Sequence, residues 1–160
     1  MEAVDPIPLP LSAPFGGAKL ALRFEDSLLV YRRDDFPDLP YPNCWDLPGG
    51  GREVKESPWE CAARELFEEF ALVLPPTQIT VARAYPAVAP GGLPTWLFAG
   101  WLTAADVASI RFGDEGQHWQ LMPIADFIEC DHAIPHLRQR VARFVQEDAW
   151  VVSPSDAAPH

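Results

Sequence analysis

The sequence predicts an α/β domain in which a mixed β-sheet lies between helices. Segments rich in β-branched and aromatic residues alternate with two segments whose apolar residues recur at helical spacing. The chain has 160 residues, of which 48% are hydrophobic and 22% are charged. This length and composition suit one globular domain with a substantial core.

The two ends of the chain are expected to lie outside this domain. Residues 1–16 are rich in proline, which favours an extended lead over a helix or a strand. Residues 151–160 are expected to form a flexible tail. The domain is therefore assigned to residues 17–150, and it contains no repeat or linker.

Two strands joined by a tight turn open the predicted domain. Residues 18–25 and 27–32 carry the strand-forming side chains, and Asp26 lies at the turn between them. Residues 33–48 combine prolines with aromatic side chains and are expected to form an ordered loop without regular structure. That loop leads into a glycine turn at residues 49–51, where the absence of Cβ atoms lets the backbone approach a ligand closely.

A helix is predicted over residues 57–71. Ser57 and Glu60 have the spacing of a capping box, and Pro58 suits the first helical position. One apolar stripe runs along the helix and consists of Trp59, Ala62, Ala63, Leu66 and Phe70.

The second half of the chain is expected to complete the sheet and cover it. Residues 77–85 and 95–102 predict a long hairpin, because a Pro-Gly-Gly break separates them. Residues 117–122 predict a further short strand. Apolar positions recur at helical spacing over residues 135–147, which predicts a second helix.

Three carboxylates share an arc of the first predicted helix, away from its apolar stripe. Glu65 precedes Glu68 by three residues and Glu69 by four, and Glu68 and Glu69 are adjacent. The three carboxylates would therefore repel one another unless a cation neutralised them. Ligands that are all oxygen suit Mg²⁺ or Mn²⁺ better than zinc. A solvated helix face is the alternative, but the helix cap and the adjacent glycines favour a metal site.

Composition limits the partners that the protein can have. The net charge is −11 and the chain has only two lysines, Lys19 and Lys55, which argues against a nucleic-acid polymer as partner. Neither a signal peptide nor a membrane span is recognisable. The three cysteines lie far apart and are expected to be reduced thiols in the cytoplasm.

Residues 50–72 resemble the Nudix box, a pattern of two glycines, several glutamates, an arginine and aliphatic residues at fixed spacing. The residues that match in register are Gly50, Glu56, Arg64, Glu65, Leu66, Glu68, Glu69 and Leu72. Ala71 departs from the pattern, which has glycine there. That glycine is expected to end the helix in a left-handed conformation, which alanine adopts at a cost of roughly 1–2 kcal/mol. The resemblance implies a Nudix-type α/β/α sandwich over about residues 17–150.

The resemblance also implies roles for individual residues. Glu115 lies in a Glu-Gly-Gln-His-Trp segment like that of MutT-like members, which makes it a metal ligand or the base that activates water; alone, the segment would read as an acidic surface loop. The implied ligands of Mg²⁺, with Mn²⁺ possible, are the Gly49 carbonyl, Glu65, Glu68, Glu69 and Glu115. Either Glu65 or Glu115 is the general base. Arg64 is expected to orient one of the acids, and Glu56 to support the site.

Substrate-binding residues are implied less directly. Arg33 is expected to contact a substrate phosphate and Arg32 precedes it, although either arginine could instead pair with a neighbouring aspartate. Trp45 could stack on a base or belong to the local core. Asp131 and His132 occupy roughly the place where MutT-like enzymes read the base edge.

The implied reaction is hydrolysis of a phosphoanhydride bond in a nucleoside diphosphate linked to another group. A nucleoside triphosphate, such as an oxidised purine nucleotide, is the first expected substrate, with the monophosphate and pyrophosphate as products. ADP-ribose, another nucleotide sugar or a dinucleoside polyphosphate is the alternative. A third possibility is a module that binds nucleotide without cleaving it.

Overall fold

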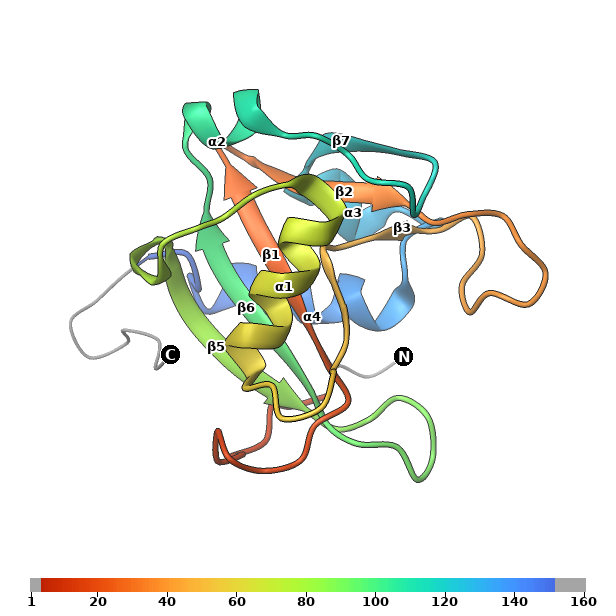
Figure 1. Ribbon diagram of the computed structural model, residues 1–160, viewed down its shortest axis with the longest axis vertical. Helices are drawn as coiled ribbons and strands as arrows, with labels where there is room; N and C mark the ends of the chain where they lie inside the picture. Colours follow the sequence, from red (N-terminus) through yellow and green to blue (C-terminus); the bar gives the residue numbers. More distant parts are fainter. Residues whose placement is uncertain (1–3, 152–160) are drawn as a thin grey trace.

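The computed structural model describes residues 4–151, which form a mixed sheet covered by helices on both faces (Figure 1). The strands in order across the sheet are β3 (Trp45–Asp46), β2 (Ser27–Arg32), β1 (Gly17–Phe24), β6 (Thr95–Trp101) and β5 (Ile79–Tyr85). Strand β4 (Gly49–Gly51) pairs with β1, and β7 (His118–Pro123) pairs with β2. Strands β1 and β6 run parallel and the other pairs are antiparallel, so the predicted mixed sheet is confirmed.

Two apolar layers hold the helices against this sheet. Helix α1 (Pro58–Phe70) crosses the near face in Figure 1, and helix α4 (Pro135–Gln146) lies behind the sheet. The α1 layer includes the fully buried Leu20, and the α4 layer includes the fully buried Leu97. The short helices α2 (Ala104–Ser109), α3 (Ile124–Glu129) and η1 (Pro76–Gln78) lie in the connections. The α/β/α sandwich is therefore confirmed.

Strands β1 and β2 separate soon after their shared turn. Their pairing is limited to Arg23 with Leu28 and Phe24 with Ser27. Beyond that point β4 pairs with the first part of β1, while β3 and β7 pair with β2. The segment 45–51 therefore runs between the two separated strands and brings the glycines beside α1.

The predicted hairpins, the strand near residue 120 and both longer helices are confirmed, with small shifts at their ends. The glycine turn was a wrong prediction, because residues 49–51 form strand β4. Gly17 and Gly49 allow this pairing: a Cβ on Gly17 would lie 2.5 Å from the Gly50 carbonyl oxygen, and Gly49 has a φ of 130°. The prediction of a loop without regular structure over 33–48 was wrong at β3. Helices α2 and α3 were missed because six residues are too few to show helical periodicity.

Helix α1 begins and ends as its sequence indicates. The Ser57 and Glu60 side chains form both hydrogen bonds of the capping box. Ala71 adopts the left-handed conformation, with φ of 56° and ψ of 30°, and its backbone N–H donates to the Phe67 carbonyl. Replacement of the family glycine by alanine therefore leaves the helix end in place, at the cost of local strain.

The N-terminal lead packs on the domain over the part that is described. Ile7 forms a bridge with Ala84 of β5, and Phe15 is buried in the layer under α1. Residues 1–3 of the expected lead, and all but the first residue of the expected tail at 151–160, lie outside the described residues. No helix within residues 4–151 is long and apolar enough to cross a membrane.

Candidate active site

Carboxylates from two distant parts of the chain line one cavity of about 230 Å³. The cavity lies between the C-terminal half of α1 and the loop that precedes β7. Its lining residues are Glu65, Glu68, Glu69, Asp114 and Glu115. We call it the acid cavity. The structure thus brings together the carboxylates that the sequence suggested as metal ligands, and it adds Asp114.

Helix α1 itself positions the loop that carries Glu115. The backbone N–H of Arg111 donates to the Phe70 carbonyl at 3.0 Å, and that of Gly113 donates to the Glu69 carbonyl at 2.8 Å. Carbonyls at a helix C-terminus have no partner within the helix, so the loop satisfies them. A Cβ on Gly113 would lie 2.8 Å from the Glu68 carbonyl oxygen, so only glycine allows this approach. The hydrogen bonds hold the two halves of the acid cavity together.

Glu69 is the most buried carboxylate of the cavity, with 6% of its surface exposed. Its Oε1 accepts a hydrogen bond of 2.8 Å from the Gly49 backbone N–H, which joins α1 to β4. Burial raises the pKa of Glu69 to about 8, although Lys19 acts in the opposite direction. Burial also raises the pKa of Glu65. Ionised carboxylates in this cavity are therefore costly without a cation to neutralise them.

Arg64 connects the acids of α1 to strand β4, which consists of three glycines and which we call the glycine strand. Its guanidinium donates to the Gly51 carbonyl at 2.8 Å and to the two carboxylate oxygens of Glu56 at 2.6 and 3.0 Å. The same group donates to Glu65 at 3.0 Å and to Glu68 at 3.2 Å. The hydrogen bond from Arg64 lowers the pKa of Glu56. Arg64 thus orients carboxylates of the cavity, and Glu56 in turn holds Arg64.

Glycine at position 50 makes room for Glu65. A Cβ built on Gly50 would lie 2.6 Å from the carboxyl carbon of Glu65 and 2.8 Å from each of its oxygens. The Glu65 carboxylate therefore packs directly against backbone, a contact that any larger residue at position 50 would prevent.

The donor set of the acid cavity fits a hard divalent cation. Every lining side chain is a carboxylate, and oxygen ligands are those that Mg²⁺ and Mn²⁺ prefer. Within residues 4–151, however, no three acidic, histidine or cysteine side chains already converge on one point. Arg64 holds Glu65 and Glu68, and the Gly49 N–H holds Glu69, so coordination requires these side chains to turn toward a shared cation.

A buried ionic cluster, which was not predicted from the sequence, lies where β1 and β2 separate. Asp46 is fully buried, and its Oδ2 accepts from Lys19 Nζ at 2.9 Å, Arg33 Nη1 at 3.0 Å and Tyr31 Oη at 3.1 Å. Lys19 Nζ also donates to the Gly49 carbonyl at 3.1 Å. One of the chain's two lysines, placed within a strand, was the signal available. The cluster fixes Arg33 and the Gly49 backbone relative to each other.

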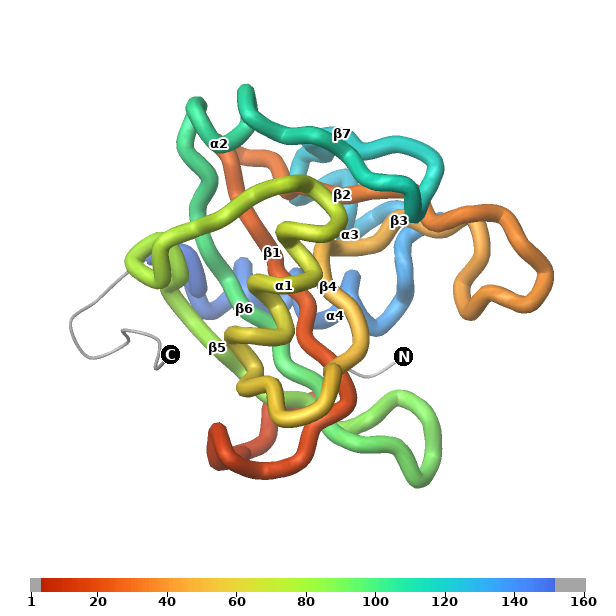
Figure 2. The backbone as a smooth tube through the Cα atoms, viewed as in Figure 1, coloured from red at the N-terminus to blue at the C-terminus, as the bar shows by residue number. Residues whose placement is uncertain are grey.

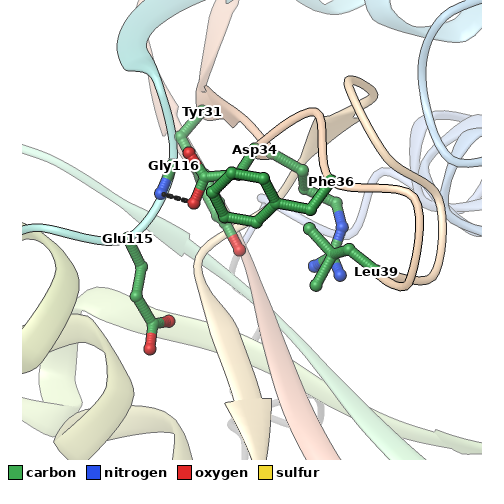
Figure 3. Close-up of a pocket in the computed structure, with 7 residues that line it drawn as sticks. Tyr31, Asp34, Phe36, Leu39, Glu115 and Gly116 are labelled. Carbon is green, nitrogen blue, oxygen red and sulfur yellow. Dashed lines mark hydrogen bonds between the residues drawn. The ribbon is translucent and has the colours of Figure 1, made fainter.

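A second cavity, of about 320 Å³, adjoins the acid cavity, because Glu115 lines both. We call it the Arg33 cavity. Its lining residues are Tyr31, Arg33, Asp34, Phe36, Leu39, Glu115 and Gly116. In Figure 3 the Glu115 carboxylate points away from the other labelled residues, while the Gly116 N–H donates to Asp34 at 3.1 Å. A positive group and an exposed aromatic ring thus lie next to the carboxylates.

The other residues suggested for substrate binding line neither cavity. Trp45 is 8% exposed and belongs to the apolar layer on the α4 side. This agrees with the alternative prediction that Trp45 is part of the local core. Arg32 donates to the Asn43 carbonyl at 3.0 Å and lies over the Trp45 ring. Asp131 and His132 are exposed, and the His132 carbonyl accepts from the Trp45 N–H. Arg32, Trp45 and His132 therefore form a separate group, and Asp131 precedes His132 in the chain.

The sequence model of the NUDIX domain matches residues 17–146. Among solved structures, the MutT protein from Methanosarcina mazei Go1 is similar, with a TM-score of 0.68, 22% identity and coverage of 87% of this chain and 99% of that one. A bifunctional NMN adenylyltransferase/ADP ribose pyrophosphatase from Francisella tularensis, complexed with AMP and Mn ion, has a TM-score of 0.66 and 21% identity over 86% of this chain and 44% of that one. An Ap4A hydrolase from C. elegans has a TM-score of 0.62 and 20% identity over 84% of this chain and 99% of that one. No curated protein sequence matches the chain.

The family match covers most of the chain and includes the glycine strand and the acids of α1, so this chain belongs to the NUDIX domain family. It is a Nudix hydrolase, an enzyme of the pyrophosphohydrolase class, and its fold is similar to that of the solved MutT proteins.

Proposed function

We propose that this enzyme hydrolyses a phosphoanhydride bond of a nucleoside diphosphate derivative with the help of Mg²⁺ or Mn²⁺. The observation that carries the proposal is the position of Glu115, which lines both the acid cavity and the Arg33 cavity. A substrate that spans this boundary would place its phosphates between a cation held by carboxylates and the Arg33 guanidinium. Phosphoryl transfer depends mainly on such positioning and charge neutralisation.

The carboxylates of Glu65, Glu68, Glu69 and Glu115, with the Gly49 carbonyl, would hold the cation. A bound divalent cation supplies charge neutralisation and lowers the pKa of water at the site. Arg64 and Glu56 act as positioning residues, because their contacts are with protein groups. The general base is Glu65 or Glu115. Glu115 borders the cavity where substrate would lie, whereas Glu65 accepts a hydrogen bond from Arg64.

A nucleoside triphosphate, including an oxidised purine nucleotide, is the first proposed substrate, with nucleoside monophosphate and pyrophosphate as products. Similarity to a MutT protein over almost the whole of that chain supports it. ADP-ribose or a dinucleoside polyphosphate is the second proposal, supported by the similarity to an ADP ribose pyrophosphatase and an Ap4A hydrolase. A non-catalytic nucleotide sensor is disfavoured, because the acids of the cavity are all retained.

The proposed partners are small nucleotides rather than nucleic-acid polymers, since the net charge of −11 opposes binding of a polyanion. We also propose a cytoplasmic location. All three cysteines are unpaired, which suits a reducing compartment.

The test is product analysis with a nucleotide panel in Mg²⁺ or Mn²⁺. Release of pyrophosphate from a nucleoside triphosphate supports the first proposal. AMP with ribose 5-phosphate, or cleavage of a dinucleoside polyphosphate, supports the second. Glu69→Gln should lower turnover by about a hundredfold or more while the protein folds normally. Full metal-dependent turnover in a folded Glu69→Gln variant would refute the ligand assignment.

A further inference from the structure

The loop of residues 110–117, which precedes β7, carries two carboxylates of the acid cavity that no side-chain contact fixes. Within residues 4–151, the carboxylates of Asp114 and Glu115 form no hydrogen bond or ion pair. The three glutamates of α1, by contrast, each accept hydrogen bonds from protein groups. The backbone of the loop therefore determines where Asp114 and Glu115 lie.

This loop is anchored on both sides of the two carboxylates, to different parts of the fold. On one side, the Gly113 N–H bonds to the C-terminus of α1. On the other side, the Gly116 N–H donates to Asp34 Oδ2 at 3.1 Å, and the Gln117 N–H donates to the Arg32 carbonyl at 2.8 Å. Figure 3 shows the bond from Gly116 to Asp34. The second anchor thus begins at the residue directly after Glu115.

Glycine at position 116 allows the second anchor. Its φ is 90°, and a Cβ there would lie 2.9 Å from Cδ2 of Tyr31 and 3.0 Å from the Arg32 carbonyl oxygen. The backbone next to Glu115 therefore packs directly on β2, and a side chain at position 116 would push it away.

The side chain of Gln117 extends the second anchor to another loop. Its Nε2 donates to the Arg33 carbonyl at 2.8 Å and to Asn43 Oδ1 at 2.7 Å, at the two ends of the 33–44 loop. A side-chain amide nitrogen carries two N–H groups, so both are bonded to protein. Gln117 is exposed, and water could accept these bonds instead. The two contacts therefore hold an exposed side chain in one place.

The loop that Gln117 joins is a wall of the Arg33 cavity. The 33–44 loop projects from the domain in Figure 2, and the Asn43 N–H closes its base by donating to the Asp34 carbonyl at 3.0 Å. Its Phe36 lines the Arg33 cavity. Gln117 thus ties this wall to the backbone that carries the exposed carboxylates of the acid cavity.

We propose that Gln117 is a positioning residue for Glu115. By fixing the 110–117 loop against the 33–44 loop, Gln117 holds the Glu115 carboxylate where it can bind the cation. The inference rests on the proposed function, because it takes Glu115 as a ligand of Mg²⁺ or Mn²⁺. Groups that hold a metal ligand in its bound geometry raise the affinity of the site. The same contact keeps the acid cavity and the Arg33 cavity in a fixed relation.

The test measures Mn²⁺ affinity by electron paramagnetic resonance, without substrate, in a double-mutant cycle. Gln117→Met keeps the length of the side chain, removes both donors and should weaken Mn²⁺ binding about tenfold. In a Glu115→Gln background the same change should weaken binding by about twofold at most, since a residue that acts through Glu115 has nothing left to position. Equal losses in both backgrounds, or no loss in the parent, would overturn the proposal.

Gln120→Met is the matched control. It makes the same substitution in β7, at a side chain that forms no hydrogen bond in the described part of the chain, residues 4–151. Mn²⁺ affinity should stay within about twofold of the parent, the usual range for a change away from the ligands.

Hydrogen–deuterium exchange in EDTA gives a readout that needs no metal. The backbone amides of the 110–117 loop should exchange about fivefold faster or more in Gln117→Met, because the loop loses part of its second anchor. Gln120→Met should leave their exchange unchanged. Unchanged exchange in Gln117→Met would also overturn the proposal.

A second variant keeps the test decisive if Gln117→Met fails to fold. Asn43→Gly removes one of the two acceptors and suits the left-handed backbone at position 43, where φ is 59°. It should weaken Mn²⁺ binding in the parent and not in the Glu115→Gln background. Equal losses in the two backgrounds would again overturn the role of Gln117.

Failure of this inference differs from failure of the proposed function. If Glu69→Gln weakens Mn²⁺ binding and Gln117→Met leaves it unchanged, the metal site stands and only the role of Gln117 is refuted. If the parent binds no Mn²⁺, the metal site itself is refuted, and the role of Gln117 with it.

Discussion

A Cβ atom on Gly50 would lie 2.6 Å from the carboxyl carbon of Glu65, so the Glu65 carboxylate occupies space that a side chain at position 50 would need. Gly50 belongs to β4 and Glu65 to α1, so this contact is one of those between the strand and the helix. The same two elements are joined by hydrogen bonds from Arg64 to the Gly51 carbonyl and from the Gly49 N–H to Glu69.

Gly50→Ala is expected to displace the Glu65 carboxylate and to weaken Mn²⁺ binding and turnover by about tenfold or more. The added methyl group leaves no space for the carboxylate in its present position. Mn²⁺ affinity from electron paramagnetic resonance measures the effect without substrate. Gly51→Ala is the control, since the nearest atom to its Cβ would be the Gly16 carbonyl oxygen at 4.0 Å. Equal metal affinity in the two variants would contradict the argument.

The stability of the metal-free protein should depend on pH through Glu69. Burial raises the pKa of Glu69 to about 8, from 4.5 for an unperturbed glutamate. Between these values the folded protein holds a proton that the unfolded chain has released, so this group lowers the free energy of unfolding as pH rises through the window. Glu69→Gln removes the dependence. In EDTA the variant should therefore gain stability relative to the parent between pH 5 and pH 8.

Thermal unfolding across that pH range measures the difference, and Mg²⁺ should reverse it because the cation binds the ionised carboxylate. Glu68→Gln is the matched control, since 54% of the Glu68 side chain is exposed. Parallel pH curves for the parent and Glu69→Gln would show that Glu69 is not the group responsible.

Lys19→Met is expected to destabilise the fold by about 3 kcal/mol, because it removes a cation from the fully buried carboxylate of Asp46. Asp26→Asn breaks an ion pair with Arg23 of the same strand at its exposed end, since the Asp26 side chain is 96% exposed, and it should cost less than about 1 kcal/mol. Urea unfolding compares the two. Similar losses in both variants would show that the Asp46 cluster contributes no more than a surface pair.

Ala71→Gly should stabilise the protein by about 1 kcal/mol, since the left-handed conformation at position 71 strains alanine and suits glycine. Ala63→Gly, within the same helix, should have the opposite effect, a loss of about 1 kcal/mol. The midpoint of urea unfolding checks both signs. A destabilised Ala71→Gly variant would indicate that the Ala71 side chain contributes packing that outweighs the backbone strain.

Local chemistry made much of this protein predictable from its sequence. The capping box of Ser57 and Glu60, the stripe ending at Phe70 and the spacing of Glu65, Glu68 and Glu69 depend on residues near one another in the chain. Helical periodicity turns such spacing directly into position on a surface. The strand pattern likewise indicated a mixed sheet. The resemblance of the segment around Glu115 to that of MutT-like members predicted that Glu115 lies near the acids of α1, as it does.

Only the tertiary structure decided which distant residues meet. The separation of β1 from β2 places Lys19 against Asp46, and it makes a strand of glycines that had been expected to turn. Packing also buried Trp45 among apolar residues and placed the buried Arg140 against Thr95 and Pro86. Such outcomes depend on how whole elements pack, because burial and long-range pairing are properties of the assembled sheet and helices rather than of any short segment.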